Sequence, residues 1–274
     1  CFVTDAQRTQ VASKVVKDEP QRSLRKSKAA ALPQIERKFV VLFGIDQYAD
    51  KTIPPLENAI FDAETVGKLF ADNLGYEVSV AKNATKADIV RALNQLSVEM
   101  RAHDSVIIYY AGHGYRNEKT GGGYWIPADA TVTDPTSWIS NTDVSKMLSG
   151  ISAKQMVMIS DSCYSGTFAE EQKLGLSAGG LKPDEVLARR SVVVMSSGGD
   201  EPVADEGKGG HSIFAWHLMQ ALRNVDNWQA GNAIFEQVKR EVMRSFPQTP
   251  QYGAVKSAGH EAGGDYLFEF RQLE

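Results

Sequence analysis

The chain has 274 residues, of which 42% are hydrophobic and 23% are charged, so it can bury a sizeable core and has the composition of a folded protein. Its formal net charge of −4, from 30 basic and 34 acidic residues, provides no basic field for nucleic acid or an anionic membrane surface. Two cysteines, Cys1 and Cys163, are too few for a disulfide framework or a CxxC metal site, and no apolar run reaches the roughly 18 residues of a transmembrane helix.

Residues 1–37 are polar, carry basic patches and two prolines, and lack a periodic apolar pattern. We predict a flexible basic arm or pro-segment here, followed by a folded domain over residues 38–274. The chain begins with Cys1 rather than Met, which is compatible with a lipid-bearing N-terminus of a bacterial envelope lipoprotein or with a fragment of a cytoplasmic protein. The sequence therefore leaves the localisation open.

Short apolar runs rich in β-branched residues predict the strands of a sheet. They lie at 39–45, 76–81, 105–111, 155–160, 191–196 and 266–270. Helical apolar spacing lies between them, at 58–73, 86–100, 143–148, 212–222 and 233–246. This alternation predicts an α/β fold with a mostly parallel sheet of about six strands, helices on both faces, and ligands bound beyond the carboxyl ends of the strands.

Two reactive side chains follow neighbouring strands of the predicted sheet. His113 stands between Gly112 and Gly114 directly after the third run, where the backbone can approach a ligand closely. Cys163 follows the fourth run and stands among polar residues and glycine, outside any apolar run. A thiol near an imidazole is what nucleophilic catalysis needs, so we predict that the Cys163 thiolate attacks a carbonyl and His113 protonates the leaving amine. Backbone N–H groups of Gly114 and Cys163 would then hold the oxyanion.

The segments around these residues resemble the caspase-like peptidases, and most closely the metacaspases and bacterial orthocaspases. The resemblance spans about residues 37–271 and rests on LENAIFDA, YYAGHG, DSCYSG, SSGGDEPVADE and GHSIFAWHL. Cys163 follows His113 by about 50 residues, as in the caspase signature. The resemblance implies the caspase-haemoglobinase fold and a cysteine endopeptidase that works through a thioester.

The resemblance also implies which residue precedes the cleaved bond, the P1 residue. Caspases have Gln two residues before the nucleophile, whereas this chain has Asp161. In metacaspases this Asp and the one matching Asp62 line a pocket for a basic side chain. Two carboxylates bind guanidinium or ammonium through charge-assisted hydrogen bonds, so cleavage after Arg or Lys is implied. Alternatively, Asp62 pairs near its own helix and Asp161 fixes a turn.

Other candidate residues lie in polar loops. Asp200 and Asp205 stand in a segment that runs beside the substrate in caspase-like folds, where they would extend the acidic site or form a solvated loop. Residues 168–190 contain four basic residues amid Gly and Ser, and we predict a linker there that the enzyme processes itself, with a solvated loop as the alternative.

Several metacaspases need calcium, and the resemblance assigns its ligands to positions matching Asp129, Asp143 and Glu170. Relatives carry an adjacent Asp pair where this chain has Thr142-Asp143, which removes one carboxylate ligand. We therefore expect no obligatory cofactor and leave calcium as an option.

Two rival functions stay open at this point. A caspase-like scaffold or adaptor would bind partners without catalysis, although it would not need both His113 and Cys163. A related cysteine hydrolase or ligase would share the dyad and differ in whether water or an amine resolves the thioester. The expected partners are peptide or protein substrates with a basic P1 residue, and the oligomeric state is undetermined.

Overall fold

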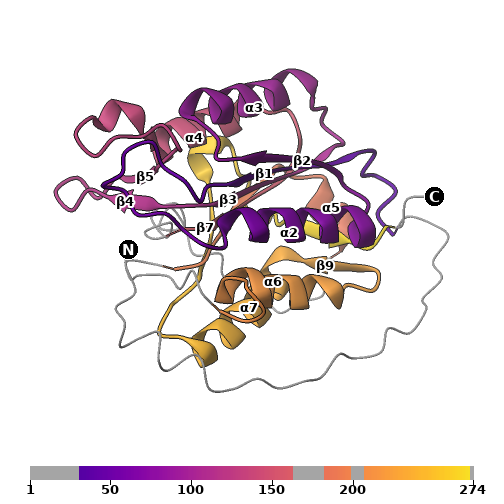
Figure 1. The fold of residues 1–274 in the computed structure, drawn as a ribbon. Coiled ribbons are helices and arrows are strands. Elements are labelled where there is room, and N and C mark those ends of the chain that lie inside the picture. The colour runs from indigo at the N-terminus through magenta and orange to yellow at the C-terminus, as the bar shows by residue number, and fades with distance from the viewer. Residues whose placement is uncertain (1–30, 163–181, 199–206, 272–274) are drawn as a thin grey trace.

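The computed structural model describes residues 31–162, 182–198 and 207–271, and its centre is a six-stranded sheet with helices on both faces (Figure 1). The strands are β1 (Lys38–Gly44), β2 (Glu77–Lys82), β3 (Ser105–Ala111), β7 (Gln155–Asp161), β8 (Ser191–Ser196) and β10 (Gln251–Ala254). Their order is β10-β8-β7-β3-β1-β2, and only β10 runs antiparallel to its neighbour. The predicted α/β fold with a mostly parallel sheet is confirmed.

The two faces of the sheet carry separate cores. One face is covered by helices α2 (Ala59–Leu74), α6 (Ile213–Arg223) and α7 (Gly231–Ser245) (Figure 1). The other face is covered by α3 (Lys86–Glu99) and α4 (Asn141–Ser149) (Figure 1). Because successive strand residues point to opposite faces, Tyr109 belongs to the first core and Tyr110 to the second.

Local capping explains where the helices of the second face begin. Thr85 and Asp88 form a capping box at the start of α3, in which the Thr85 side chain accepts from the Asp88 N–H and the Asp88 carboxylate accepts from the Thr85 N–H. Ser140 caps α4 in a similar way by accepting from the Asp143 N–H.

The sixth strand of the central sheet is not the one expected from the sequence. Residues Leu267–Glu269 form β11, which pairs with β9 (Trp228–Ala230) in a separate two-stranded sheet. The edge position of the central sheet belongs to β10, whose four residues include Gly253 and follow Pro250. Such a short segment produces no apolar run, so the pattern did not reveal it.

A small sheet beyond the carboxyl end of β3 was also not expected. It consists of β4 (Gly114–Arg116), β5 (Gly123–Trp125) and β6 (Ile139–Ser140), in that order. A short 3-10 turn, η1 (Pro135–Ser137), precedes β6, and a second one, η3 (Lys256–Ala258), follows β10.

Residues 31–37, which we assigned to the N-terminal arm from the sequence, pack against the folded domain. Leu32 is 1% exposed and Ile35 is 3% exposed, and both pack with Val186, Ala230 and Leu267. The folded domain therefore includes residues 31–37, because two apolar side chains three positions apart suffice to dock this segment. Residues 1–30 lie outside the described part of the chain.

Part of the predicted processing linker is packed as well. Residues Pro183–Leu187 form the short helix α5, and Val186 is buried. The Arg190 guanidinium donates hydrogen bonds to the carbonyl oxygens of Leu148, Ile151 and Ala153 at 2.8 to 3.1 Å. Arg190 is thus a structural anchor rather than a processing site, while residues 163–181 lie outside the described ranges.

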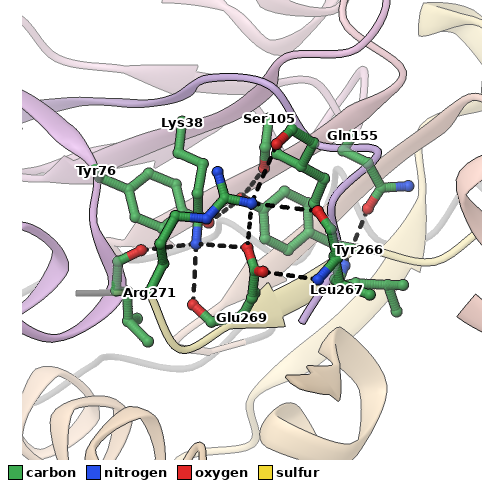
Figure 2. A network of polar contacts seen from close by, with 11 residues as sticks. Lys38, Tyr76, Ser105, Gln155, Tyr266, Leu267, Glu269 and Arg271 are labelled. Carbon is green, nitrogen blue, oxygen red and sulfur yellow. Dashed lines mark hydrogen bonds and ion pairs between the residues drawn. The ribbon is translucent and has the colours of Figure 1, made fainter. Parts of the chain in front are cut away.

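A buried polar network closes the amino ends of the central strands (Figure 2). The Lys38 ammonium, at the start of β1, donates to the carbonyl oxygens of Leu74 and Glu269 at 2.6 and 2.9 Å, and lies 3.4 Å from the Glu269 carboxylate. Arg271 pairs with the same carboxylate at 2.8 Å. The network attaches the C-terminal segment to β1 and stabilises the edge of the sheet that faces away from His113.

None of the described helices combines the length and the apolar composition that crossing a bilayer requires.

Candidate active site

The carboxyl ends of three central strands are aligned side by side. Gly44 of β1 pairs with Ala111 of β3, which pairs with Asp161 of β7. His113 lies two residues beyond Ala111, and Cys163 lies at the same offset beyond Asp161. Neighbouring strands are about 4.8 Å apart, so the ends of β3 and β7, which precede His113 and Cys163 in the chain, lie side by side. Cys163 itself lies outside the described residues, so the dyad stays a prediction.

His113 is held in one orientation by main-chain and ring contacts. Its Nε2 lies 2.9 Å from the Pro54 carbonyl oxygen, and because a carbonyl only accepts, Nε2 carries the proton. The neutral imidazole then has its lone pair on Nδ1. The backbone N–H of His113 donates to the Tyr48 hydroxyl at 2.9 Å, and the ring centroids of Tyr48 and His113 lie 5.1 Å apart. Burial to 7% exposure lowers the pKa of His113 and favours the neutral ring.

The turn that carries His113 depends on a glycine and on a buried tyrosine. A Cβ atom at Gly112 would lie 2.9 Å from the Tyr110 hydroxyl, which is closer than side chains tolerate. The Tyr110 hydroxyl lies 2.8 Å from the His113 carbonyl oxygen and 3.1 Å from that of Ile126. Gly114 begins β4 and pairs with Trp125. The turn is therefore tied down on both sides of the imidazole.

The structure brings Asp62 and Asp161 together at the N-terminus of α6. Ser212, the N-cap of α6, donates its backbone N–H to Asp62 Oδ2 at 3.0 Å and its hydroxyl to Asp161 Oδ2. His211 Nδ1 lies 2.6 Å from Asp62 Oδ1. The side chains of α2, β7 and α6 thus form one hydrogen-bonded group, and Asp62 does not cap its own helix.

Opposing effects act on the charge of this group. Burial raises the pKa of Asp62, while hydrogen bonds from His211 and Ser212 act in the opposite direction. The positive end of the α6 dipole also stabilises nearby carboxylates, by about 0.3–1 kcal/mol for an exposed group. Tyr109, wholly buried, has its pKa raised well above the usual value, first by burial and then by the charges of Asp161 and Asp62.

A third acid, Asp46, lies close to this group and was missed from the sequence. It follows β1, and its Oδ1 accepts from the Ile60 N–H at 3.1 Å. Burial raises its pKa, and the charge of Asp62 adds to that shift. The rule that selects residues just beyond strand ends, used for His113, would also have selected Asp46. His211 and Ser212 lie in the segment GHSIFAWHL, but neither that segment nor the residue types around Tyr48 and the Pro54 carbonyl indicated these long-range contacts.

The remaining candidates divide into described and undescribed residues. Asp129 accepts from the Lys86 N–H at 2.8 Å at the start of α3, and Asp143 accepts from the Ser140 hydroxyl at 2.7 Å at the start of α4. Both acids therefore serve helix N-termini. Within residues 31–162, 182–198 and 207–271, no group of three His, Cys, Asp or Glu side chains is placed to hold a metal ion. Glu170, Asp200 and Asp205 lie outside these ranges.

Comparison with known families agrees with this geometry. A family model for the caspase domain matches residues 37–258. The chain therefore belongs to the caspase domain family of cysteine peptidases.

Individual relatives narrow this placement. Metacaspase-1A of Neurospora crassa is 23% identical over 224 residues, which cover 74% of this chain and 47% of that protein. The chain thus spans about half the length of this curated relative. Relatedness to metacaspases agrees with the resemblance seen in the sequence.

Two solved structures share the fold. Caspase-1 of Spodoptera frugiperda has a TM-score of 0.63 at 13% identity, and the match covers 92% of this chain and 98% of the caspase-1 chain. A protein from Geobacter sulfurreducens has a TM-score of 0.55 at 14% identity, with 84% and 100% covered. The caspase-like fold is confirmed.

Proposed function

We propose that this chain is a cysteine endopeptidase that cleaves proteins after Arg or Lys through a thioester on Cys163. The observation that carries the proposal is the meeting of Asp62 and Asp161 at the N-terminus of α6, beside the strand ends that lead to His113 and Cys163. Membership of a cysteine peptidase family supports the reaction class. The two acids support the basic specificity.

The contacts of His113 support its role as the proton donor. The Pro54 carbonyl holds Nε2–H, so the second ring nitrogen, Nδ1, is the atom that takes a proton and passes it on. In the proposed reaction, the Cys163 sulfur attacks the scissile carbonyl and its thiol proton reaches Nδ1. His113 then gives this proton to the leaving amine, and water hydrolyses the thioester.

The oxyanion would be held by the backbone N–H groups of Gly114 and Cys163. One such donor commonly lowers the barrier by about 3 kcal/mol. A glycine at position 114 leaves space for the substrate carbonyl beside His113.

The acid pair supports selection of a cationic P1 side chain. Two carboxylates joined through Ser212 concentrate negative charge in a largely buried site, where guanidinium or ammonium gains charge-assisted hydrogen bonds and an acidic side chain is repelled. Cleavage of the enzyme by itself within residues 163–181 follows from the same specificity, since Lys173 lies in that segment.

Matched fluorogenic peptides that differ only in P1 test the proposal. Wild-type enzyme is expected to cleave Arg and Lys peptides and to leave the Asp peptide intact, whereas Cys163→Ala cleaves none. A preference for Asp would overturn the specificity. Parallel assays with calcium and with a chelator would show whether the ion is required.

Two further readouts separate the rival functions. Mass spectrometry after treatment with an Arg-directed electrophile should find the adduct on Cys163, and no adduct under any condition would favour a scaffold. Product masses distinguish hydrolysis from ligation. Incubation of the wild type beside Cys163→Ala tests self-cleavage, because equal fragments in both would implicate another protease.

A further inference from the structure

His211 occupies an unusual position in the acid pair. Its imidazole lies flat against the Phe61 ring, with centroids 4.6 Å apart and planes at 8°, while Nδ1 contacts Asp62. The residues before it, Gly209 and Gly210, have φ values of 65° and 79°, which glycine adopts without strain. The turn therefore delivers the imidazole to the N-terminus of α6 in one fixed orientation.

Asp62 is enclosed by these contacts. Asp62 is 1% exposed, its Oδ1 accepts a hydrogen bond from His211 Nδ1, and its Oδ2 accepts one from the Ser212 N–H. A substrate cation could contact this carboxylate only by displacing the imidazole. That displacement would break a 2.6 Å contact and separate two stacked rings. Direct contact between Asp62 and the P1 side chain is thus disfavoured.

The imidazole has a second nitrogen that the described structure does not use. Among the residues that the structure describes, His211 Nε2 has no hydrogen-bond partner, although the residue is only 6% exposed. Because a carboxylate accepts, Nδ1 carries the proton, so the neutral ring has its lone pair on Nε2. A lone pair backed by the charge of Asp62 is a good acceptor for a guanidinium or ammonium N–H.

We propose that His211 Nε2 is a specificity-determining contact for the P1 side chain and that Asp62 acts through His211 as a positioning residue. Asp161, which is 8% exposed, is the carboxylate that meets the cation. Phe61 is 48% exposed and provides an apolar surface for the methylene groups of Arg or Lys. This inference rests on the proposed basic specificity and changes which groups carry it.

A double-mutant cycle with Asp62→Asn and His211→Gln tests the inference on Arg and Lys peptides. Each single change should lower kcat/KM about tenfold, mainly by raising KM, since Asp62→Asn removes the charge behind the imidazole and His211→Gln removes the ring that contacts Asp62. If Asp62 acts through His211, the kcat/KM of the double variant should lie within about twofold of the kcat/KM of the less active single variant. Effects that multiply to about 100-fold would overturn the inference.

Two controls separate recognition from folding. Alkylation of Cys163 by iodoacetamide, which has no P1 side chain, should change little in all variants, and the thermal unfolding midpoint measures separately any stability lost with the buried contact. His211→Asn places an amide donor near the position of Nδ1 and removes Nε2, so it should keep the fold and still lose about tenfold in kcat/KM. Full activity of His211→Asn would show that Nε2 makes no contact and would overturn the proposal.

The same assays distinguish this inference from the function beneath it. A wild-type enzyme that cleaves neither Arg nor Lys peptides overturns both. A wild-type enzyme that cleaves them, combined with a multiplicative cycle, overturns only the role of His211.

Discussion

The two ends of the central sheet both bury charged side chains, but they balance them differently. At the amino ends, Lys38 and Arg271 flank one carboxylate, Glu269, whose side chain is fully enclosed (Figure 2). At the carboxyl ends, Asp62 contacts the His211 imidazole and the Ser212 backbone N–H, and Asp161 accepts from the Ser212 hydroxyl. Among the described contacts, the first set pairs one anion with two cations, whereas the second brings two acidic side chains together. Burial of charge alone therefore does not mark a functional site, and our proposal for the carboxyl ends rests on the meeting of two acids there.

The largest expected effect is a loss of activity, without a loss of stability, on changes at the carboxyl ends of the strands. Cys163→Ala and His113→Ala are each expected to reduce peptide cleavage by at least about 10³-fold, because neither the nucleophile nor its proton donor can be replaced by solvent. Their unfolding midpoints should stay close to wild type. Measurable turnover by Cys163→Ala after removal of contaminating proteases would contradict the assigned nucleophile.

The next effect should appear only in stability. Glu269→Gln leaves Lys38 and Arg271 without their counter-charge, and removal of one partner from a buried pair costs about 3–5 kcal/mol. Denaturant unfolding measures this loss, and kcat of the folded fraction should be unchanged.

A surface pair provides the control for that measurement. Glu241→Gln breaks the exposed ion pair with Arg244, which should cost less than about 1 kcal/mol. Equal losses in the two variants would mean that the amino-end network is not a special source of stability.

Asp161→Asn should have the reverse profile to Glu269→Gln. The amide keeps the size of the side chain and still accepts from the Ser212 hydroxyl, so the fold should persist. Loss of the charge should lower kcat/KM for Arg and Lys peptides about 10²-fold. Unchanged alkylation of Cys163 would show that the nucleophile is intact, and an unchanged Arg preference would remove Asp161 from substrate recognition.

The smallest effect is a dependence of stability on pH at the amino end. Burial lowers the pKa of Lys38 from 10.5 to about 8, although Glu269 opposes the shift. Between pH 8 and about 10.5 the unfolded chain therefore binds a proton that the folded chain does not, so this group makes stability rise with pH.

Comparison with Lys38→Met isolates this contribution. The free energy of unfolding of wild type relative to the variant should increase by about 1–3 kcal/mol from pH 7.5 to pH 10. Buried tyrosines, whose pKa values are raised in the folded chain, are present in both proteins, so their contribution cancels in the difference. A flat difference would indicate that Lys38 stays charged throughout.

Much of the fold was predictable because its signals are local. The strands 105–111 and 191–196 have the predicted bounds, since a strand buried on both faces needs a continuous apolar run. Helix α3 begins at the predicted residue, Lys86, because its capping box lies within four residues of sequence. The placement of His113 beyond a strand end follows from the same local pattern.

Contacts between distant segments could not be predicted in this way. β10 is too short for an apolar run, the strand predicted at 266–270 pairs with β9 rather than joining the central sheet, and Leu32 is buried because a segment far along the chain covers it. The Pro54 carbonyl that orients His113 is a main-chain group and has no residue signature.

The sequence by itself determined the alternating α/β pattern, the strand ends that carry His113 and Cys163, and the acidic residues at positions 62 and 161. Only the tertiary structure decided that Ser212 joins the two acids and that His211 encloses Asp62, 149 residues earlier in the chain. The physical reason is that hydrophobic periodicity records which residues are buried. It does not record which buried polar groups meet once the helices dock.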